Sequence, residues 1–424
     1  MKRVGSRTWL TLAFAVISAV APGPPAKKGT AATIGVNGEV GYETFGYPSS
    51  ETGGSSWENF FAANLRGRGE LIPDLSYRFD VRAVADDAEF TAGVLSVRNR
   101  QFRRPYVSFK ELALSYRALP ELRLGIGKEL VRWSIIEGLQ PANLMDPTDQ
   151  SDPFRIWEEG VWSASLHYEP GEWSVDAVVV PIAFTPSRAP LGRWQIIPAV
   201  VTQTQDMPPV QFEETQTALR VQGHLQEWEG ALIQYTGRVT DAIFVPQLIF
   251  VGGEQQFRLE MVHRYPHLYA WGAQLSRPLG DSFIWRNEAV YYHSPDQDED
   301  DFVHWVTGLE YSYEVWRVVL NYFREDVTAE APIPVTSKGA LRFFRSFLFG
   351  EVRYDPGSRW RVTLRGGHDF TELFTLIQPE VSFEIYPDLR IALGGDYIDA
   401  SKPSSYFYSI RHDSRISARI QYFF

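Results

Sequence analysis

Apolar and polar residues alternate strictly over the last ten positions of the sequence, 415–424. The apolar parity holds Ile416, Ala418, Ile420, Tyr422 and Phe424, and the polar parity holds Arg415, Ser417, Arg419 and Gln421. A two-residue period of this kind is typical of a β-strand with one apolar and one polar face. Because the segment ends on an aromatic residue, it favours a strand that closes a cylinder over the edge strand of a sandwich.

The same alternation begins near residue 34 and recurs along the chain in pairs of segments joined by tight turns. The turns are expected at 72–74, 119–121, 169–171, 229–230, 278–281, near 314, 355–358 and 386–388, where Pro, Gly, Asp and Glu gather. The pattern predicts about 18 strands, or about 16 if a weak strand is miscounted. The apolar parity of each strand, such as Ile233 and Tyr235 after the turn at 229–230, is expected to face away from the lumen.

Long polar segments alternate with these tight turns. They cover residues 44–56, 86–105, 132–159, 183–214, 241–266, 294–301, 326–340 and 400–410. Short turns on one rim and long loops on the other are the asymmetry of membrane barrels. We therefore predict an all-β fold, a single antiparallel transmembrane β-barrel over residues 33–424, with short periplasmic turns and long extracellular loops. A β-propeller would also supply many strands, but no blade motif repeats along the sequence.

Composition agrees with this fold and excludes several others. Aromatic residues make up 14% of the chain, as expected if they form girdles at the two membrane interfaces. After the N-terminus, no apolar run is long enough for a transmembrane helix. The formal net charge of -11 argues against a nucleic-acid partner. The sequence contains no cysteine, so disulfides, thiolate metal sites and a lipid anchor on cysteine are excluded.

Residues 1–32 are expected to be a signal peptide and a short leader. Lys2, Arg3 and Arg7 give a positive start, and residues 9–20 form an apolar core that is too short to span a membrane. Small residues place the cleavage site after Ala21 or after Ala32. Export of this kind agrees with a final location in the cell outer membrane.

With these features, the chain resembles the bacterial outer-membrane porin-like barrels, including the alginate-export type. One local piece is similar to a segment of uncharacterised porin-like families: Gly-Lys-Glu-Leu-Val-Arg-Trp at 127–133, followed by Asn-Leu-Met-Asp-Pro-Thr-Asp at 143–149. The resemblance implies outer-membrane lipid and lipopolysaccharide as surroundings, and recognition of Phe424 by the barrel-insertion machinery. It names no solute.

The polar parity of the strands carries the residues that are expected to line the pore. They are Arg78, Arg82, Arg123, Arg220, Arg238, Arg286, Arg317, Arg361, Arg365, Arg390, Arg415, Arg419, Asp80, Asp176 and Glu288. Arginines in the wall of an acidic protein suggest a polar pore with a weak anion preference. The alternative is that arginines and acids pair across strands and only hold the wall together.

The segment 132–159 is the predicted constriction, because a loop rich in aromatic and acidic residues can fold inward and narrow a pore. The candidates are Trp133, Asp146, Asp149, Asp152 and Trp157. An external loop packed on its neighbours is the alternative interpretation. The three aspartates lack the alternate spacing and the glycine of a calcium loop, so no metal site and no cofactor is expected.

The predicted function is passive diffusion of a small polar solute, with an anionic solute favoured, through an outer-membrane channel. Two alternatives remain open: a polysaccharide export channel, and a structural or assembly protein with a plugged lumen. The eight histidines are scattered and form no His-x-Ser motif, so an enzyme is not expected. The sequence leaves the oligomeric state open.

Overall fold

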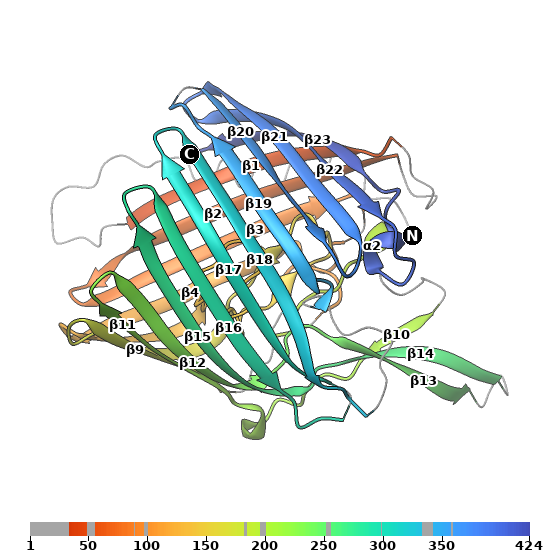
Figure 1. Ribbon diagram of the computed structural model, residues 1–424, viewed down its shortest axis with the longest axis horizontal. Coiled ribbons are helices and arrows are strands. Elements are labelled where there is room, and N and C mark those ends of the chain that lie inside the picture. The colour runs from red at the N-terminus through yellow and green to blue at the C-terminus, as the bar shows by residue number, and fades with distance from the viewer. Residues whose placement is uncertain are drawn as a thin grey trace. The chain divides into compact units, whose positions relative to one another are not determined.

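Eighteen of the described strands form one sheet that closes on itself in the computed structural model (Figure 1). The structure describes residues 34–48, 56–88, 90–96, 101–181, 185–195, 201–251, 256–297, 299–332, 342–357 and 359–424. The predicted signal peptide and its two cleavage sites lie outside these residues.

The barrel strands alternate in direction around the ring. They are β1 (Ile34–Gly46), β2 (Trp57–Ile72), β3 (Leu75–Asp86), β4 (Val107–Leu119), β5 (Leu122–Glu129), β8 (Val161–Tyr168), β9 (Trp173–Val180), β11 (Gln216–Leu225), β12 (Trp228–Arg238), β15 (His267–Leu279), β16 (Phe283–His293), β17 (Asp301–Tyr313), β18 (Trp316–Ala329), β19 (Ser346–Tyr354), β20 (Trp360–Asp369), β21 (Phe374–Tyr386), β22 (Leu389–Ala400) and β23 (Arg415–Phe423). Each pairs antiparallel with the barrel strands before and after it. The predicted barrel of 18 strands is confirmed.

Pairing of β1 with β23 closes the cylinder, as the alternation over 415–424 predicted. Tyr42 lies opposite Ile420, and Val40 lies opposite Tyr422. Beyond the strand, Gly38 and Phe424 exchange two backbone hydrogen bonds of 2.8 and 3.0 Å. A Cβ atom at position 38 would lie 2.4 Å from the Phe424 ring, so this contact requires glycine.

The turns at one end of the barrel are short, and we name this end the short-turn rim. At the other end, the long-loop rim, the connections are longer, apart from residues 370–373 between β20 and β21. One turn differs from its predicted place. The strands β11 and β12 meet at Gln226 and Glu227 rather than at 229–230, because Gln226 takes the left-handed conformation (φ 56°) while Gly230 sits in β12.

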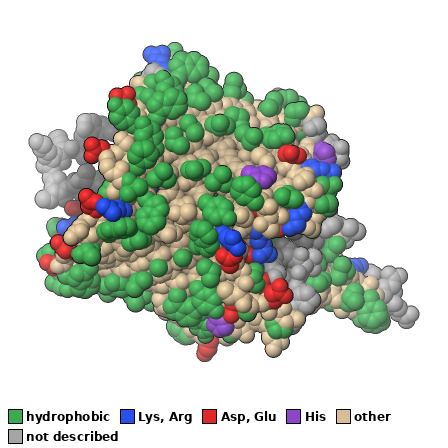
Figure 2. Space-filling view, in the orientation of Figure 1, with side chains coloured by type: hydrophobic (Ala, Val, Ile, Leu, Met, Phe, Trp, Pro, Cys, Tyr) green, Lys and Arg blue, Asp and Glu red, His purple; other side chains and the backbone are tan. Residues whose placement is uncertain are grey.

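Apolar side chains cover the outer face of the barrel. Ile126, Leu232 and Leu393 are 64%, 67% and 66% exposed, which a soluble domain would avoid and a lipid-facing band requires. Figure 2 shows hydrophobic side chains spread over this face, with charged side chains mostly toward its edges. Register therefore separates an apolar outside from an inside that carries the polar residues.

Part of the inner face is also apolar, which the sequence analysis did not predict. Ile233 and Tyr235 point inward and are 3% and 0% exposed, so their predicted outward orientation is wrong. They belong to a buried cluster with residues of β8, β9, β11, β15, β16 and β17, among them Val178, Ala270 and Val290. Strand β12 has apolar residues of both parities because it faces lipid on one side and this cluster on the other. We call this part of the lumen the filled half.

The long-loop connections hold further elements. They are β6 (Thr148–Asp149), β7 (Trp157–Glu158), η1 (Gly192–Trp194), β10 (Thr202–Gln205), η2 (Phe212–Glu214), β13 (Ile243–Val251), β14 (Gln256–Arg264) and α2 (Tyr406–Ser409). The segment 241–266, expected to be a polar loop, is a β13–β14 hairpin that forms a separate sheet with β10 outside the ring (Figure 1). Apolar residues on both hairpin strands, such as Leu248 opposite Leu259, explain the difference.

A second apolar cluster packs at the long-loop rim. It joins Trp194 of η1 and Phe407 of α2 to Phe45, Phe347 and Phe374 at the strand ends. Among the described residues, no helix is long and apolar enough to cross a membrane.

Candidate functional site

The connection between β5 and β8, residues 130–160, runs through the inside of the barrel, and we call it the crossing loop. Its first half is fixed to β15 and β16 by Glu288, which is fully buried. Glu288 accepts hydrogen bonds from Ser134 Oγ at 3.0 Å, from the Ala142 amide at 2.7 Å and from Gln274 Nε2 at 2.8 Å. The Ile135 amide donates to the same carboxylate at 3.1 Å. One carboxylate therefore organises both the loop and the wall.

The second half of the crossing loop is fixed to β1, β22 and β23. Arg415 donates to Asp152 at 2.7 Å and to Asp396 at 2.6 Å, and its side chain is 1% exposed. Arg155 contacts Glu43 at 3.1 Å and Asp396 at 3.4 Å. Six strands or more separate β15 and β16 from β1 and β23 in either direction around the ring. The loop thus joins opposite walls, in agreement with the predicted inward fold of 132–159.

Two buried aspartates fix the path of the loop between these anchors. Asp146 is 4% exposed and accepts the Val131 amide at 2.8 and 2.9 Å. Burial raises the pKa of Asp146 to about 8, so its side chain is mainly protonated at neutral pH. Burial alone would also raise the pKa of Asp149, but the guanidinium groups of Arg104 and Arg188 lower it below its ordinary value.

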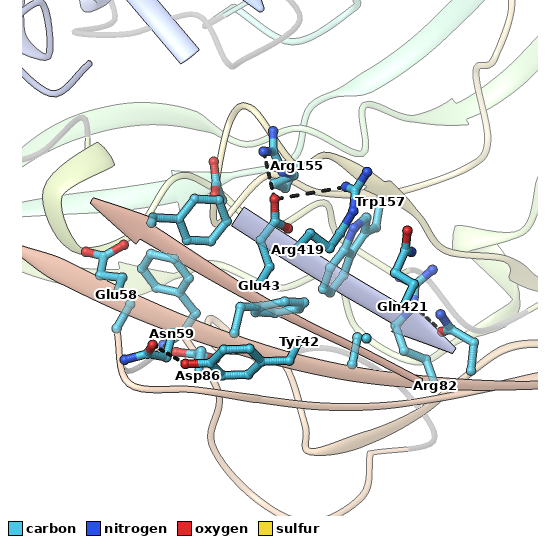
Figure 3. Close-up of a pocket in the computed structure, with 18 of the residues that line it drawn as sticks. Tyr42, Glu43, Glu58, Asn59, Arg82, Asp86, Arg155, Trp157, Arg419 and Gln421 are labelled. Carbon is cyan, nitrogen blue, oxygen red and sulfur yellow. Dashed lines mark hydrogen bonds and ion pairs between the residues drawn. The ribbon is translucent and has the colours of Figure 1, made fainter. Parts of the chain in front are cut away.

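Trp157 faces a cavity of about 210 Å³ between the crossing loop and β1, β2, β3 and β23, which we call the β1–β3 cavity. Two guanidinium groups pack on its indole ring, with Arg82 4.4 Å and Arg104 4.5 Å from the ring centroid. Figure 3 shows Glu43 in this cavity between Arg155 and Arg419, at 3.1 and 4.0 Å. Cationic, anionic and aromatic groups therefore meet at one place in the lumen.

Arg82 lines this cavity without an ion pair to a described residue. It is 7% exposed, and its Nε donates to Asn64 at 3.0 Å. Its Nη1 has no hydrogen-bond partner among the described residues. A guanidinium without an ion-pair partner can bind an anionic group.

Two further cavities line the inner wall. One, of about 520 Å³, lies between the crossing loop and β19 to β23, and Arg155, Trp157 and Arg419 border both it and the β1–β3 cavity. The other, of about 720 Å³, lies toward the short-turn rim against β2 to β5, β8, β9 and β11. We name them the β19–β23 cavity and the short-turn basin. Leu130 to Trp133 of the crossing loop border the basin.

The arginines predicted to line the pore are mostly held in ion pairs. Arg238 shares the outward parity of Leu232 on β12 and pairs with Glu214 of η2, so its predicted place in the lumen is wrong. Ten of the twelve contact a carboxylate: Arg78, Arg220, Arg238, Arg286, Arg317, Arg361, Arg365, Arg390, Arg415 and Arg419. Their partners include the predicted Asp176, and Asp80 pairs with Arg66. Arg82 and Arg123 make no ion pair with a described residue. This pattern favours the wall-pairing interpretation over a continuous row of free arginines.

Several predicted residues are covered rather than open to the lumen. Glu288 and Arg415 are 0% and 3% exposed because the crossing loop lies on them. Trp133 is buried in the apolar cluster of the filled half. Arg155 and Arg104 were missed by the sequence analysis, because a charged residue in a long loop carries no periodicity that places it on the lumen side.

The predicted constriction residues form no metal site. Asp146, Asp149 and Asp152 bind a backbone amide, two arginines and Arg415 respectively, so their carboxylates do not converge. At the rim, His293 contacts Asp301 at 2.8 Å, while the neighbouring Ser294 hydroxyl donates to the His267 carbonyl at 2.7 Å. That bond directs the hydroxyl away from the His293–Asp301 pair.

No family model and no curated protein matches the sequence. Solved structures do match the fold. Pseudomonas aeruginosa OccK11 (OpdR) aligns with a TM-score of 0.52 and 8% identity over 93% of this chain and 95% of that chain. Pseudomonas aeruginosa OccK3 (OpdO) gives 0.52 and 10% over 92% and 95%, and a BenF-like porin from Pseudomonas fluorescens Pf-5 gives 0.52 and 9% over 93% and 98%. The predicted porin-like barrel is confirmed as the fold of this chain.

Proposed function

We propose that this protein is an outer-membrane channel that lets small polar solutes diffuse passively, with a weak preference for anions. The crossing loop carries the proposal, because it narrows a closed barrel to charged cavities without abolishing them. The apolar outer band fits a lipid surrounding, and the similar solved structures include one named a porin. The anion preference rests on Arg82, which lines the β1–β3 cavity and makes no ion pair with a described residue.

Planar-bilayer recording of the purified, detergent-folded protein tests the proposal. We expect discrete current steps and a reversal potential that is shifted modestly toward the anion in a salt gradient. Heat-modifiable migration on a gel shows that the barrel is folded, and cell fractionation checks its place in the outer membrane. A folded barrel that carries no current at any voltage would contradict a channel.

One observation favours a second candidate, a structural protein with a plugged lumen. Apolar clusters occupy the filled half and part of the long-loop rim, and neither cluster serves diffusion. The same recording separates the two functions. Polysaccharide export gains less support, because most of the wall arginines are already paired with carboxylates of the protein.

A further inference from the structure

We infer that the permeation path is one-sided: solute passes through the β1–β3 cavity, and the filled half conducts nothing. Trp157 sets the width of this path, and Arg82 sets its charge preference. The inference rests on the proposed channel function and adds to it the route and two specificity-determining residues.

The filled half is closed by dry packing. Tyr235, Ala270 and Val290 of the wall are all 0% exposed, and Met145 of the crossing loop packs into the same cluster at 2%. A close-packed apolar interior leaves no water column, and an ion that enters it loses its hydration without compensation. Solute therefore has no path along β12, β15 and β16.

The β1–β3 cavity, in contrast, reaches along the wall. At the long-loop rim it is bordered by Phe45, Glu58 and Phe90, and farther along β1 and β23 it is bordered by Glu39 and Gln421. Its lining is mixed rather than apolar, so a hydrated solute exchanges water for fixed polar groups. The β19–β23 cavity shares part of this lining and widens the path on one side.

Trp157 is the rigid part of this passage. Its ring packs against Phe60, with centroids 5.3 Å apart, while Arg82 and Arg104 lie within 4.5 Å of its centroid. A side chain held by three groups cannot swing aside easily, so it fixes the free width beside it. Arg155 and Arg419 also line the cavity, and the Glu43 carboxylate lies 3.1 and 4.0 Å from them.

The native chain contains no cysteine, so single cysteines test the route directly. Gln421→Cys places a thiol in the β1–β3 cavity, and Ser165→Cys is the matched control in the short-turn basin. Both parent side chains are polar, point inward and are half-buried. Each folded variant is recorded in a bilayer before and after a charged methanethiosulfonate reagent, and labelling is checked by mass.

We expect labelled Gln421→Cys to lose about half of its conductance or more, and labelled Ser165→Cys to lose about a tenth or less. Block at Ser165→Cys alone, equal effects at both sites, or a thiol at position 421 that does not react would overturn the one-sided path. If the unlabelled variants and the parent carry no current, the channel function itself fails, which is a separate result.

Two further variants test the determinants. Trp157→Ala is expected to raise single-channel conductance roughly twofold, because it removes the fixed ring from the narrow part. Arg82→Gln is expected to remove most of the anion preference, since glutamine keeps a donor to Asn64 but loses the charge. An unchanged conductance in Trp157→Ala, or an unchanged selectivity in Arg82→Gln, would overturn the role assigned to that residue.

Discussion

The two halves of the lumen differ in the inward side chains that meet the crossing loop. Both receive the crossing loop, and both are built from strands that alternate inward and outward. In the filled half, the inward residues are apolar and the loop completes a core like that of a soluble protein. In the other half, which we call the open half, the inward residues are charged and the loop leaves cavities. One rigid side thus holds the loop in place while the other side stays available to solute.

Removal of the Glu288 carboxylate is the strongest way to break this division. Glu288→Ala leaves Ser134, the Ile135 and Ala142 amides and Gln274 without their acceptor. Each buried donor that loses its partner costs about 1–3 kcal/mol, so we expect a loss of at least about 3 kcal/mol in the free energy of unfolding. Conductance should rise as the loop detaches. Glu288→Gln, which keeps one acceptor oxygen, serves as the control.

Urea unfolding in detergent measures the free energy of unfolding of Glu288→Ala, and bilayer recording measures its conductance. If Glu288→Ala were as stable as the parent and conducted identically, Glu288 would not anchor the crossing loop.

The packing of the filled half is tested by two neighbouring residues of β12. Ile233 points inward and is 3% exposed, while Leu232 points outward and is 67% exposed. Ile233→Ala should destabilise the barrel by about 2–5 kcal/mol, because it opens a cavity in a packed core. Leu232→Ala, facing detergent, should cost about 1 kcal/mol or less. Equal losses in the unfolding free energy would mean that the filled half is not packed.

A pH titration tests the protonated carboxyl in the crossing loop. Because the folded-state pKa of Asp146 is raised to about 8, its contribution to stability is full below the unfolded-state pKa. That contribution is lost as the pH rises through about 8. We therefore expect the unfolding free energy to fall as the pH rises from about 4 to about 8, and Asp146→Asn to remove most of that fall. An identical pH profile in both proteins would show that Asp146 is not buried as described.

The smallest expected effect lies in the charge of the open half. Arg365 borders the β19–β23 cavity and lies 3.7 Å from Glu351, whereas Arg361 is bound to Asp355 near the short-turn rim. Arg365→Glu should shift the reversal potential toward cations by a few millivolts, and Arg361→Glu should shift it less. If the variant that carries both Arg361→Glu and Arg365→Glu fails to fold, these arginines are structural charges. If it folds and keeps its selectivity, they lie outside the permeation path.

The barrel was predictable from sequence because the features that define it lie within short stretches of the chain. A period of two residues, tight turns and long polar connections fix strand number and direction without knowledge of the interior. The inward course of 132–159 was also anticipated, since its aromatic and acidic residues suit the inside of a barrel. The filled half was not predicted, because apolar residues such as Ile233 and Tyr235 are equally suited to face lipid or a protein core. Only the partner residues, brought by the crossing loop from far along the chain, decide between the two.

The seam between β1 and β23 has a consequence for the order of folding. All other barrel pairings join barrel strands that are consecutive along the chain, so they can form as the chain is laid down. The seam joins the two most distant strands, and it has the highest entropic cost of loop closure. Until Phe424 meets Gly38, the edges of β1 and β23 expose unpaired backbone groups that can pair with another chain. Closure of the barrel and protection of the strand edges from aggregation are therefore the same event. A substitution of Gly38 should lower the yield of assembled protein more than it changes the conductance of the assembled barrel.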